Sequence, residues 1–296
     1  MLTPDMKNAF DTDGFLVVPD FIDRETCRRL LDHAHGLADE LAPEAARTAF
    51  STALQRGTED AWFLDSGGKV RCFFDSRALA PDGSLLCPPR ETVNKIGHAL
   101  HDRDPIFGPL SRDPGLAAIA AGLGVSQPLL VQSMVLFKQA HTGGEVVSHQ
   151  DATYLMTDPP SVLGFWLALE DATVENGCLR VLPGGHRSPL ACRYRRTGNV
   201  VAYDPPDPPS FDETRFIPLE AEAGTLIVLH GLLPHSSFAN TSDRSRGAFT
   251  LHVVDGTCKW SEDNWLHPDP DMPMRGFDRT GSGFPVQGIP GRSVPA

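Results

Sequence analysis

The sequence predicts a mainly β fold, in which an antiparallel barrel or double sheet is supported by a layer of helices. Helical patterns crowd residues 1–125, whereas short apolar runs separated by Gly and Pro turns fill residues 126–256. No long polar linker interrupts the 296 residues, and no internal repeat is found. We therefore expect one domain over residues 1–296, with helical support in 1–125, the β core in about 126–256 and a coil tail in 268–296.

The first elements alternate between helix and strand. A short helix is expected before Gly14, and the β-branched and apolar residues 15–18 are expected to form a strand that a proline ends. Asp23 has a side chain suited to a helix N-cap, and a charged, amphipathic pattern follows over residues 24–41. This segment is therefore predicted to be a helix.

The next elements lead up to the β core. Residues 70–74 are typical of a strand. Residues 94–101 are interpreted as a helix, because three apolar residues recur there at near-helical spacing. Residues 116–123 are predicted to form another short helix, which glycines end.

Five apolar runs are predicted to be the strands of the core. Each run is bounded by Gly, Pro or Asn turns, and the first is nearly continuous in its apolar character, as expected of a buried strand. The runs are residues 129–138, 162–169, 178–182, 225–230 and 247–254. The proline-rich residues 204–209 are expected to form a stiff surface loop.

Composition limits the classes of partner. The net charge of −12 disfavours nucleic acid or an anionic membrane as a partner, and a small-molecule substrate is expected instead. The six cysteines are scattered without a C-x-x-C pair, so reduced thiols are expected. No signal-peptide pattern begins the chain and no apolar stretch is long enough to cross a bilayer, so we expect a cytoplasmic protein.

One short motif suggests a metal site. His149 and Asp151 are two residues apart, a spacing that places both side chains on the same face of a β-strand. Two histidines and one carboxylate with open coordination positions are typical of non-haem Fe(II) centres that use O2. His235, just after an expected strand, could supply the second histidine, and His230 at the end of that strand is its rival. Spacing alone does not choose between them.

An arginine that follows His235 in the sequence could bind a cosubstrate. The planar guanidinium of Arg246 can make two parallel hydrogen bonds to one carboxylate. A dicarboxylate could therefore chelate iron at one end and meet Arg246 at the other. Arg244 is two residues earlier and would share the same face of a strand, so it competes for this role.

Several motifs together resemble the phytanoyl-CoA hydroxylase family of Fe(II)- and 2-oxoglutarate-dependent dioxygenases. The resemblance covers about residues 7–270. The segments that carry it are Asn94–His101, Val131–Met134, Phe137–Gln139, Gly143–Val146, His149–Ala152, Glu170–Thr173, Glu175–Leu179, Pro183–His186, His235, Ser242–Arg246 and Asn264–Leu266.

The resemblance implies a double-stranded β-helix of the jelly-roll, cupin-like type. It implies Fe(II) bound by His149, Asp151 and His235, and it selects Arg246 over Arg244 and His235 over His230. It further implies O2 and the cosubstrate 2-oxoglutarate, in a pocket lined by Lys95, Met134, Trp166, Ser237 and Arg246. Gly185 stands where the family more often has Ser, which changes at most one hydrogen bond outside the ligands.

These features favour a hydroxylase that releases succinate and CO2. A carboxylate at position 151 leaves no room for a halide ligand, which favours hydroxylation over halogenation. The alternatives are a cupin-like protein that binds a metal or small acid without catalysis, and a metal-dependent isomerase or hydrolase on the same barrel. Arg193, Arg195 and Arg196 could meet the phosphates of a CoA thioester, but a solvated loop is the preferred interpretation.

Overall fold

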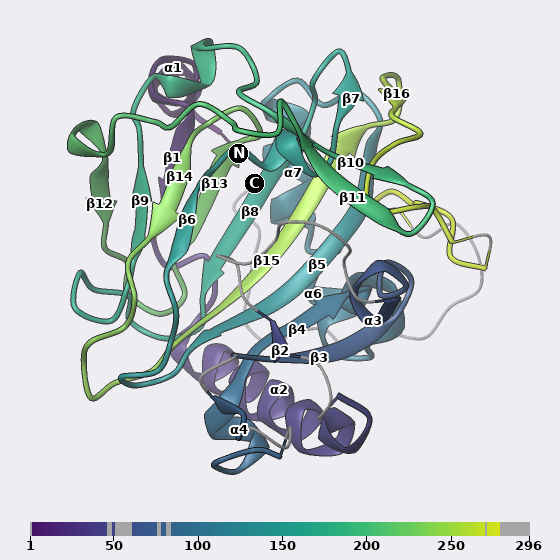
Figure 1. Cartoon of the computed structure of the whole chain (residues 1–296). Coiled ribbons are helices and arrows are strands. Elements are labelled where there is room, and N and C mark those ends of the chain that lie inside the picture. Colours follow the sequence, from purple (N-terminus) through teal and green to yellow (C-terminus); the bar gives the residue numbers. More distant parts are fainter. Residues whose placement is uncertain are drawn as a thin grey trace.

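Two sheets, antiparallel except for the parallel pair of β2 and β3, pack face to face around the centre of the molecule (Figure 1). The computed structural model describes residues 2–45, 49–50, 61–75, 78–80, 84–269 and 271–278. In their spatial order, the strands of the major sheet are β1 Phe15–Val18, β13 Leu226–His230, β8 Leu163–Ala168, β15 Arg246–Asp255, β5 Pro128–Lys138, β4 Val93–His98, β3 Val70–Asp75 and β2 Ala49–Phe50. Those of the minor sheet are β12 Ile217–Leu219, β9 Leu179–Val181, β14 His235–Ser237 and β6 Val146–His149.

This arrangement confirms the predicted mainly β, jelly-roll fold. The two longest strands, β5 and β15, pair from Arg246 with Lys138 to Asp255 with Pro128 and form the spine of the major sheet. Their apolar residues are buried on one face beneath helices and on the other between the sheets. A strand that is covered on both faces needs no polar alternation, which is why the β5 sequence is nearly continuous in apolar residues.

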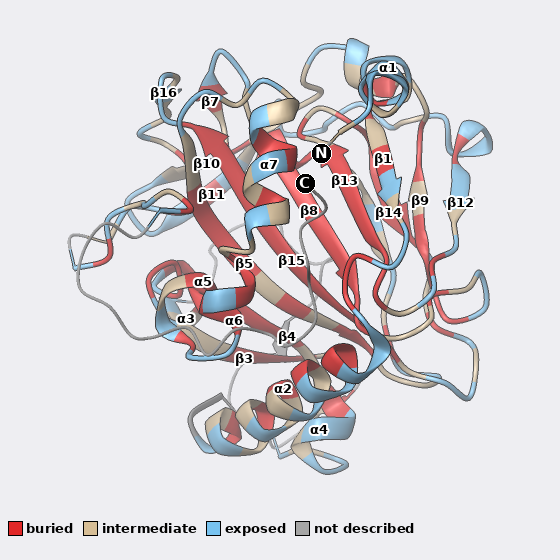
Figure 2. Ribbon diagram, turned by 180° about the vertical axis from the view of Figure 1, so that it is seen from behind, coloured by how far each residue is buried: buried red, intermediate tan, exposed pale blue. Residues whose placement is uncertain are grey.

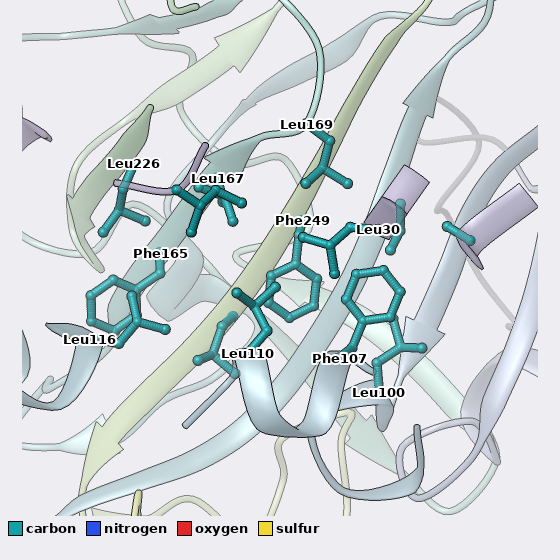
Figure 3. Close-up of a cluster of buried hydrophobic side chains, with 14 of the residues drawn as sticks. Leu30, Leu100, Phe107, Leu110, Leu116, Phe165, Leu167, Leu169, Leu226 and Phe249 are labelled. Atoms are coloured by element: carbon teal, nitrogen blue, oxygen red, sulfur yellow. The ribbon is translucent and has the colours of Figure 1, made fainter. Parts of the chain in front are cut away.

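Helices cover the outer face of the major sheet (Figure 2). Those in front of the sheet are α2 Arg24–Ala45, α5 Leu100–Arg103, α6 Phe107–Leu110 and α7 Pro114–Gly122. The remaining helices are α1 Pro4–Asp13, α3 Ala61–Leu64 and α4 Pro89–Thr92, and Phe63 of α3 lines the inner side, between the sheets. The Asp23 carboxylate accepts a hydrogen bond from the Thr26 backbone N–H at 2.7 Å, so the predicted cap of α2 is confirmed. Between helices and sheet lies the main core, in which Phe107 of α6 stacks on Phe249 of β15 with 5.0 Å between ring centroids (Figure 3).

The predicted helix over residues 94–101 is wrong. Residues 93–98 form β4, which pairs with β3 on one side and β5 on the other. Ile96 enters the core beneath the helices, while Lys95 lies opposite Leu136 and faces the space between the sheets. The two neighbouring strands satisfy the backbone of β4 and override its weak local preference. Only the last part of the prediction is helical, in α5.

Two smaller β pairs lie beside the sheets. The hairpin of β10 Arg193–Thr197 and β11 Val200–Asp204 is followed by the proline-rich loop, whose residues 205–210 are exposed as predicted. β7 Thr157–Asp158 pairs with β16 Lys259–Trp260. Of the predicted coil tail, residues 271–278 run beside the start of β5, where the Leu130 N–H donates to the Arg275 carbonyl. Residue 270 and the part from residue 279 lie outside the described residues.

The six cysteines are unpaired, in agreement with their scattered spacing. Among the helices that the structure describes, none has the length and apolar character required to cross a membrane.

Candidate metal centre and its cavity

Two histidines face each other across the minor sheet. β14 pairs with β6 so that His235 lies directly opposite His149, and their ring centroids are 4.3 Å apart. Each Nδ1–H donates to the carbonyl two residues earlier, from His149 to Val147 at 2.9 Å and from His235 to Leu233 at 3.0 Å. A carbonyl can only accept, so these bonds leave each Nε2 with a free lone pair for a metal.

Asp151 completes the group. Its Oδ1 lies 3.7 Å from His149 Nε2 and 3.6 Å from His235 Nε2, and the potential ligand atoms of all three residues lie within 4.8 Å of one another. Burial opposes the ionisation of Asp151, but the neighbouring histidines hold its pKa well below the usual range. Burial lowers the pKa of His235 to about 4. Near neutral pH the site therefore offers an imidazole and a carboxylate in the forms that bind metal.

The sequence correctly predicts that the side chains of His149 and Asp151 converge. The strand predicted to carry them ends at His149, however, two residues before Asp151. β6 ends at His149, Gln150 remains extended, and Asp151 begins a 3-10 turn over Asp151–Thr153. The Gln150 side chain fixes this transition, because it donates to the Leu232 carbonyl at 2.8 Å and accepts from the Ala191 N–H at 2.8 Å. One extended residue is enough to keep both ligands on the same side.

A third histidine, which the sequence interpretation missed, holds the far side of the carboxylate. His252 Nε2 lies 3.3 Å from Asp151 Oδ2. His252 is six residues beyond Arg246 on the same strand, so the even spacing placed it on the cavity face and could have identified it. Its contact leaves Oδ1 directed at the two other histidines.

A His252→Leu variant is expected to bind Fe(II) about 10- to 100-fold more weakly. It removes a polar contact that orients a ligand from outside the ligand set, and losses of this size follow from such changes. Anaerobic calorimetric titration with Fe(II) measures the effect. The exposed His267, replaced in the same way, is the control and should leave the affinity unchanged. Equal affinities for the His252→Leu variant and the wild type would contradict this role.

Gly164 provides the space in which Asp151 sits. On β8 it lies opposite His252, and a Cβ at this position would lie 2.8 Å from Asp151 Oδ2. A Gly164→Ala variant should therefore displace the carboxylate and weaken Fe(II) binding by at least about 10-fold. This is the smallest loss typical of changes to groups that orient a metal ligand. Gly36→Ala is the matched control, because nothing lies within 4 Å of its added Cβ. If both alanine variants titrate like the wild type, the carboxylate has more freedom than the structure indicates.

A cavity of about 560 Å³ opens between the two sheets at this group. All the site residues predicted from the sequence line it: Lys95, Met134, His149, Asp151, Trp166, His235, Ser237 and Arg246. The two rivals lie elsewhere. His230 contacts the rings of Phe10 and His186, and Arg244 is exposed. The geometry thus brings His235 and Arg246 together with the motif.

Arg246 is a buried cation that lines this cavity. It is 2% exposed, and its Nε and Nη1 have no hydrogen-bond partner among the described residues. Burial lowers its pKa to about 10. The adjacent Lys138 is already engaged, because its Nζ donates to the carbonyls of Gly144 and Phe238. An unpaired buried guanidinium is costly, so the site is built to receive an anion.

The other predicted residues surround the path between Arg246 and the metal ligands. The Arg246 guanidinium lies 5.6 Å from the Trp166 ring, and Ser237 is two residues past His235 on β14.

Met134 is half-buried and pairs in register with Thr250, another cavity residue that the sequence interpretation missed. Lys95 lies over the Phe73 ring at 4.8 Å. Tyr154 and Gln132 also line the cavity and were missed. Gln132 is two residues before Met134 on β5, so its spacing could have identified it, whereas nothing in the spacing marks Tyr154.

The basic cluster of the hairpin is structural and not the solvated loop that was expected. Arg193 and Arg195 both form ion pairs with Asp263. Arg196 donates to the carbonyls of Leu64 and Trp265. These bonds hold β10 against the segment that carries Trp265, because the guanidinium groups donate to protein oxygens there and not to water.

Comparison with known proteins gives the family. The model of the family "Phytanoyl-CoA dioxygenase (PhyH)" matches residues 10–248. The chain is 41% identical to a phytanoyl-CoA dioxygenase of Arabidopsis thaliana, over 90% of this chain and 93% of that protein. It is 42% identical to phytanoyl-CoA dioxygenase domain-containing protein 1 of Bos taurus, over 92% and 97%.

A solved structure supports the fold. The epimerase SnoN, in complex with Fe3+, alpha ketoglutarate and nogalamycin RO, superposes with a TM-score of 0.60 at 20% identity, over 96% of this chain and 95% of that one. Such identity supports a shared architecture only. The family match and the identity to whole relatives go further, and from them we conclude that this chain belongs to the phytanoyl-CoA dioxygenase (PhyH) family.

Proposed function

We propose that the protein is an Fe(II)- and 2-oxoglutarate-dependent dioxygenase that hydroxylates a small organic substrate. Membership of the family supports an oxidoreductase of the dioxygenase type. The donor set of His149, Asp151 and His235 suits Fe(II), because two imidazoles and one carboxylate on one side leave the other coordination positions open. When bound, iron would let O2 oxidise 2-oxoglutarate to succinate and CO2, with the second oxygen atom passing to the substrate.

The observation that carries the cosubstrate is Arg246. A dicarboxylate that reaches from the metal ligands along Trp166 would place its far carboxylate at a guanidinium whose Nε and Nη1 are unpartnered. The planar guanidinium can make two parallel N–H···O bonds to one carboxylate through two nitrogens on the same edge, and the carboxylate would balance its buried charge. Ser237 can donate its hydroxyl and Lys95 can add a second positive charge, and both line the same cavity. Met134 would contribute packing.

The remaining residues shape the reaction. Trp166, Leu229 and Leu179 give the cavity apolar walls that restrict water around the metal ligands. The Nδ1 bonds of His149 and His235 hold both imidazoles in the tautomer that binds metal. Asp151 occupies the third ligand position, which favours transfer of oxygen over transfer of a halide.

The test is stoichiometric conversion of 2-oxoglutarate to succinate by the Fe(II)-loaded protein under O2, combined with calorimetric titration of 2-oxoglutarate. Binding and succinate formation are both expected, and a screen of small organic compounds should find one that raises succinate above the background. Binding without succinate would instead indicate a cupin-like binding protein. Metal binding without any 2-oxoglutarate affinity would indicate an isomerase or hydrolase on the same barrel.

A further inference from the structure

All three tyrosines of the chain form one cluster beside the metal centre. The Tyr154 and Tyr194 rings meet edge to face at 5.4 Å, and Tyr194 contacts Tyr203 at 5.1 Å. The hydroxyls of Tyr154 and Tyr203 lie 3.2 Å apart. The proposed function assigns no role to any of them.

Tyr154 is the member that reaches the metal ligands. It follows the 3-10 turn that begins at Asp151, and its N–H donates to the Asp151 carbonyl at 3.0 Å. Its ring meets the His149 ring at 67°, with 5.7 Å between centroids. The backbone bond on one side and the ring contact on the other fix the phenol next to two of the three candidate ligands.

Tyr154 also faces open space. It lines the 560 Å³ cavity that contains Asp151 and His235. It lines a second cavity of about 240 Å³ as well, beneath the proline-rich loop, together with His149 and Cys192. The ring is therefore part of the wall between the two cavities. When no substrate occupies the larger one, an electron-rich aromatic ring remains exposed toward the reactive centre.

We propose that Tyr154 is a self-modification site, hydroxylated on the ring carbon next to its phenol oxygen when the protein turns over without a substrate. The inference rests on the proposed function, which supplies the oxidant. One O2 and one 2-oxoglutarate are consumed for each tyrosine. One oxygen atom enters succinate as CO2 leaves, and the other enters a ring C–H bond. O2 gains four electrons, two from 2-oxoglutarate and two from the ring carbon, and the product is a catechol.

The neighbours of Tyr154 suit this product. The hydroxyl of Tyr203 already contacts the phenol oxygen, and either group can donate, so the pair can hold the ring in place before and after the change. Phe63 and Phe73 lie in the same apolar cluster but carry no hydroxyl to activate a ring carbon. The rivals are Met134, a half-buried thioether in the same cavity, and Trp265, whose electron-rich indole also lines it.

The experiment incubates the intact protein with Fe(II), 2-oxoglutarate and isotopically heavy O2, without any organic substrate, and maps modified peptides by mass spectrometry. One heavy oxygen atom is expected on Tyr154. It should be absent when 2-oxoglutarate is omitted. Tyr154→Phe should lose the modification at this position, whereas Tyr203→Phe should retain it at Tyr154.

Two results would overturn the inference and leave the proposed function standing. Succinate could form with no modified peptide, or the heavy oxygen could appear on Met134 or Trp265 and not on Tyr154. If the wild-type protein forms no succinate at all, the proposed function fails and the inference fails with it. Succinate measured in the same sample therefore separates the two failures.

Discussion

An Asp151→Ala variant is expected to lose at least about 100-fold in Fe(II) affinity and to form succinate from 2-oxoglutarate at a correspondingly small fraction of the wild-type rate at limiting metal. Changes outside a ligand set already cost about 10- to 100-fold, and this change removes a ligand itself. It also leaves His149, His235 and His252 without the carboxylate that all three contact.

Anaerobic titration with Fe(II) and a succinate assay measure this effect. Asp207→Ala, in the exposed proline-rich loop, is the control and should behave as the wild type. His235→Ala should match Asp151→Ala. If both ligand variants consume 2-oxoglutarate at the wild-type rate, the proposed metal centre is wrong.

An Arg246→Met variant is expected to bind 2-oxoglutarate more weakly without losing thermal stability. Loss of one partner from a buried charge pair costs about 2–5 kcal/mol, so the Kd for 2-oxoglutarate is expected to rise by at least about 30-fold. The ligand-free variant should nevertheless have a Tm at or above that of the wild type, because a buried guanidinium with unpartnered Nε and Nη1 is replaced by an apolar side chain.

Thermal unfolding with and without 2-oxoglutarate measures both effects. The ligand should raise the Tm of the wild type and have little effect on the variant, since a ligand stabilises only the state that it binds. Arg244→Met is the matched control, because Arg244 is exposed and two residues away. A variant that binds 2-oxoglutarate as tightly as the wild type would place the cosubstrate elsewhere.

The fold could be predicted largely because long, continuous apolar runs have a single interpretation. β5, β8, β13 and β15 were recognisable from composition and from the turns around them. β4 was not, because its residues carry both a helical spacing of apolar side chains and a polar lysine. Its strand conformation depends on hydrogen bonds to β3 and β5, which are distant in the sequence.

In the candidate site, too, some residues are marked by the sequence and others are not. His149 and Asp151 could be found because their spacing is local, and the family resemblance singled out His235 and Arg246. Tyr154 carries no local signal, and its position follows from how the turn after β6 meets the cavity. Gln132 could have been found from its alternation with Met134 along β5. His252 is an intermediate case, since the alternation along β15 placed it and only the structure shows what it touches.

The pairing of His235 with His149 has a consequence for the order of assembly. The two imidazoles come from strands that are far apart in the sequence, so they meet only after β6 and β14 have paired. The ion therefore cannot nucleate folding, as it does in small domains whose structure depends on metal. We expect the chain to fold first and to take up its ion afterwards, so that a chelator empties the finished protein without unfolding it.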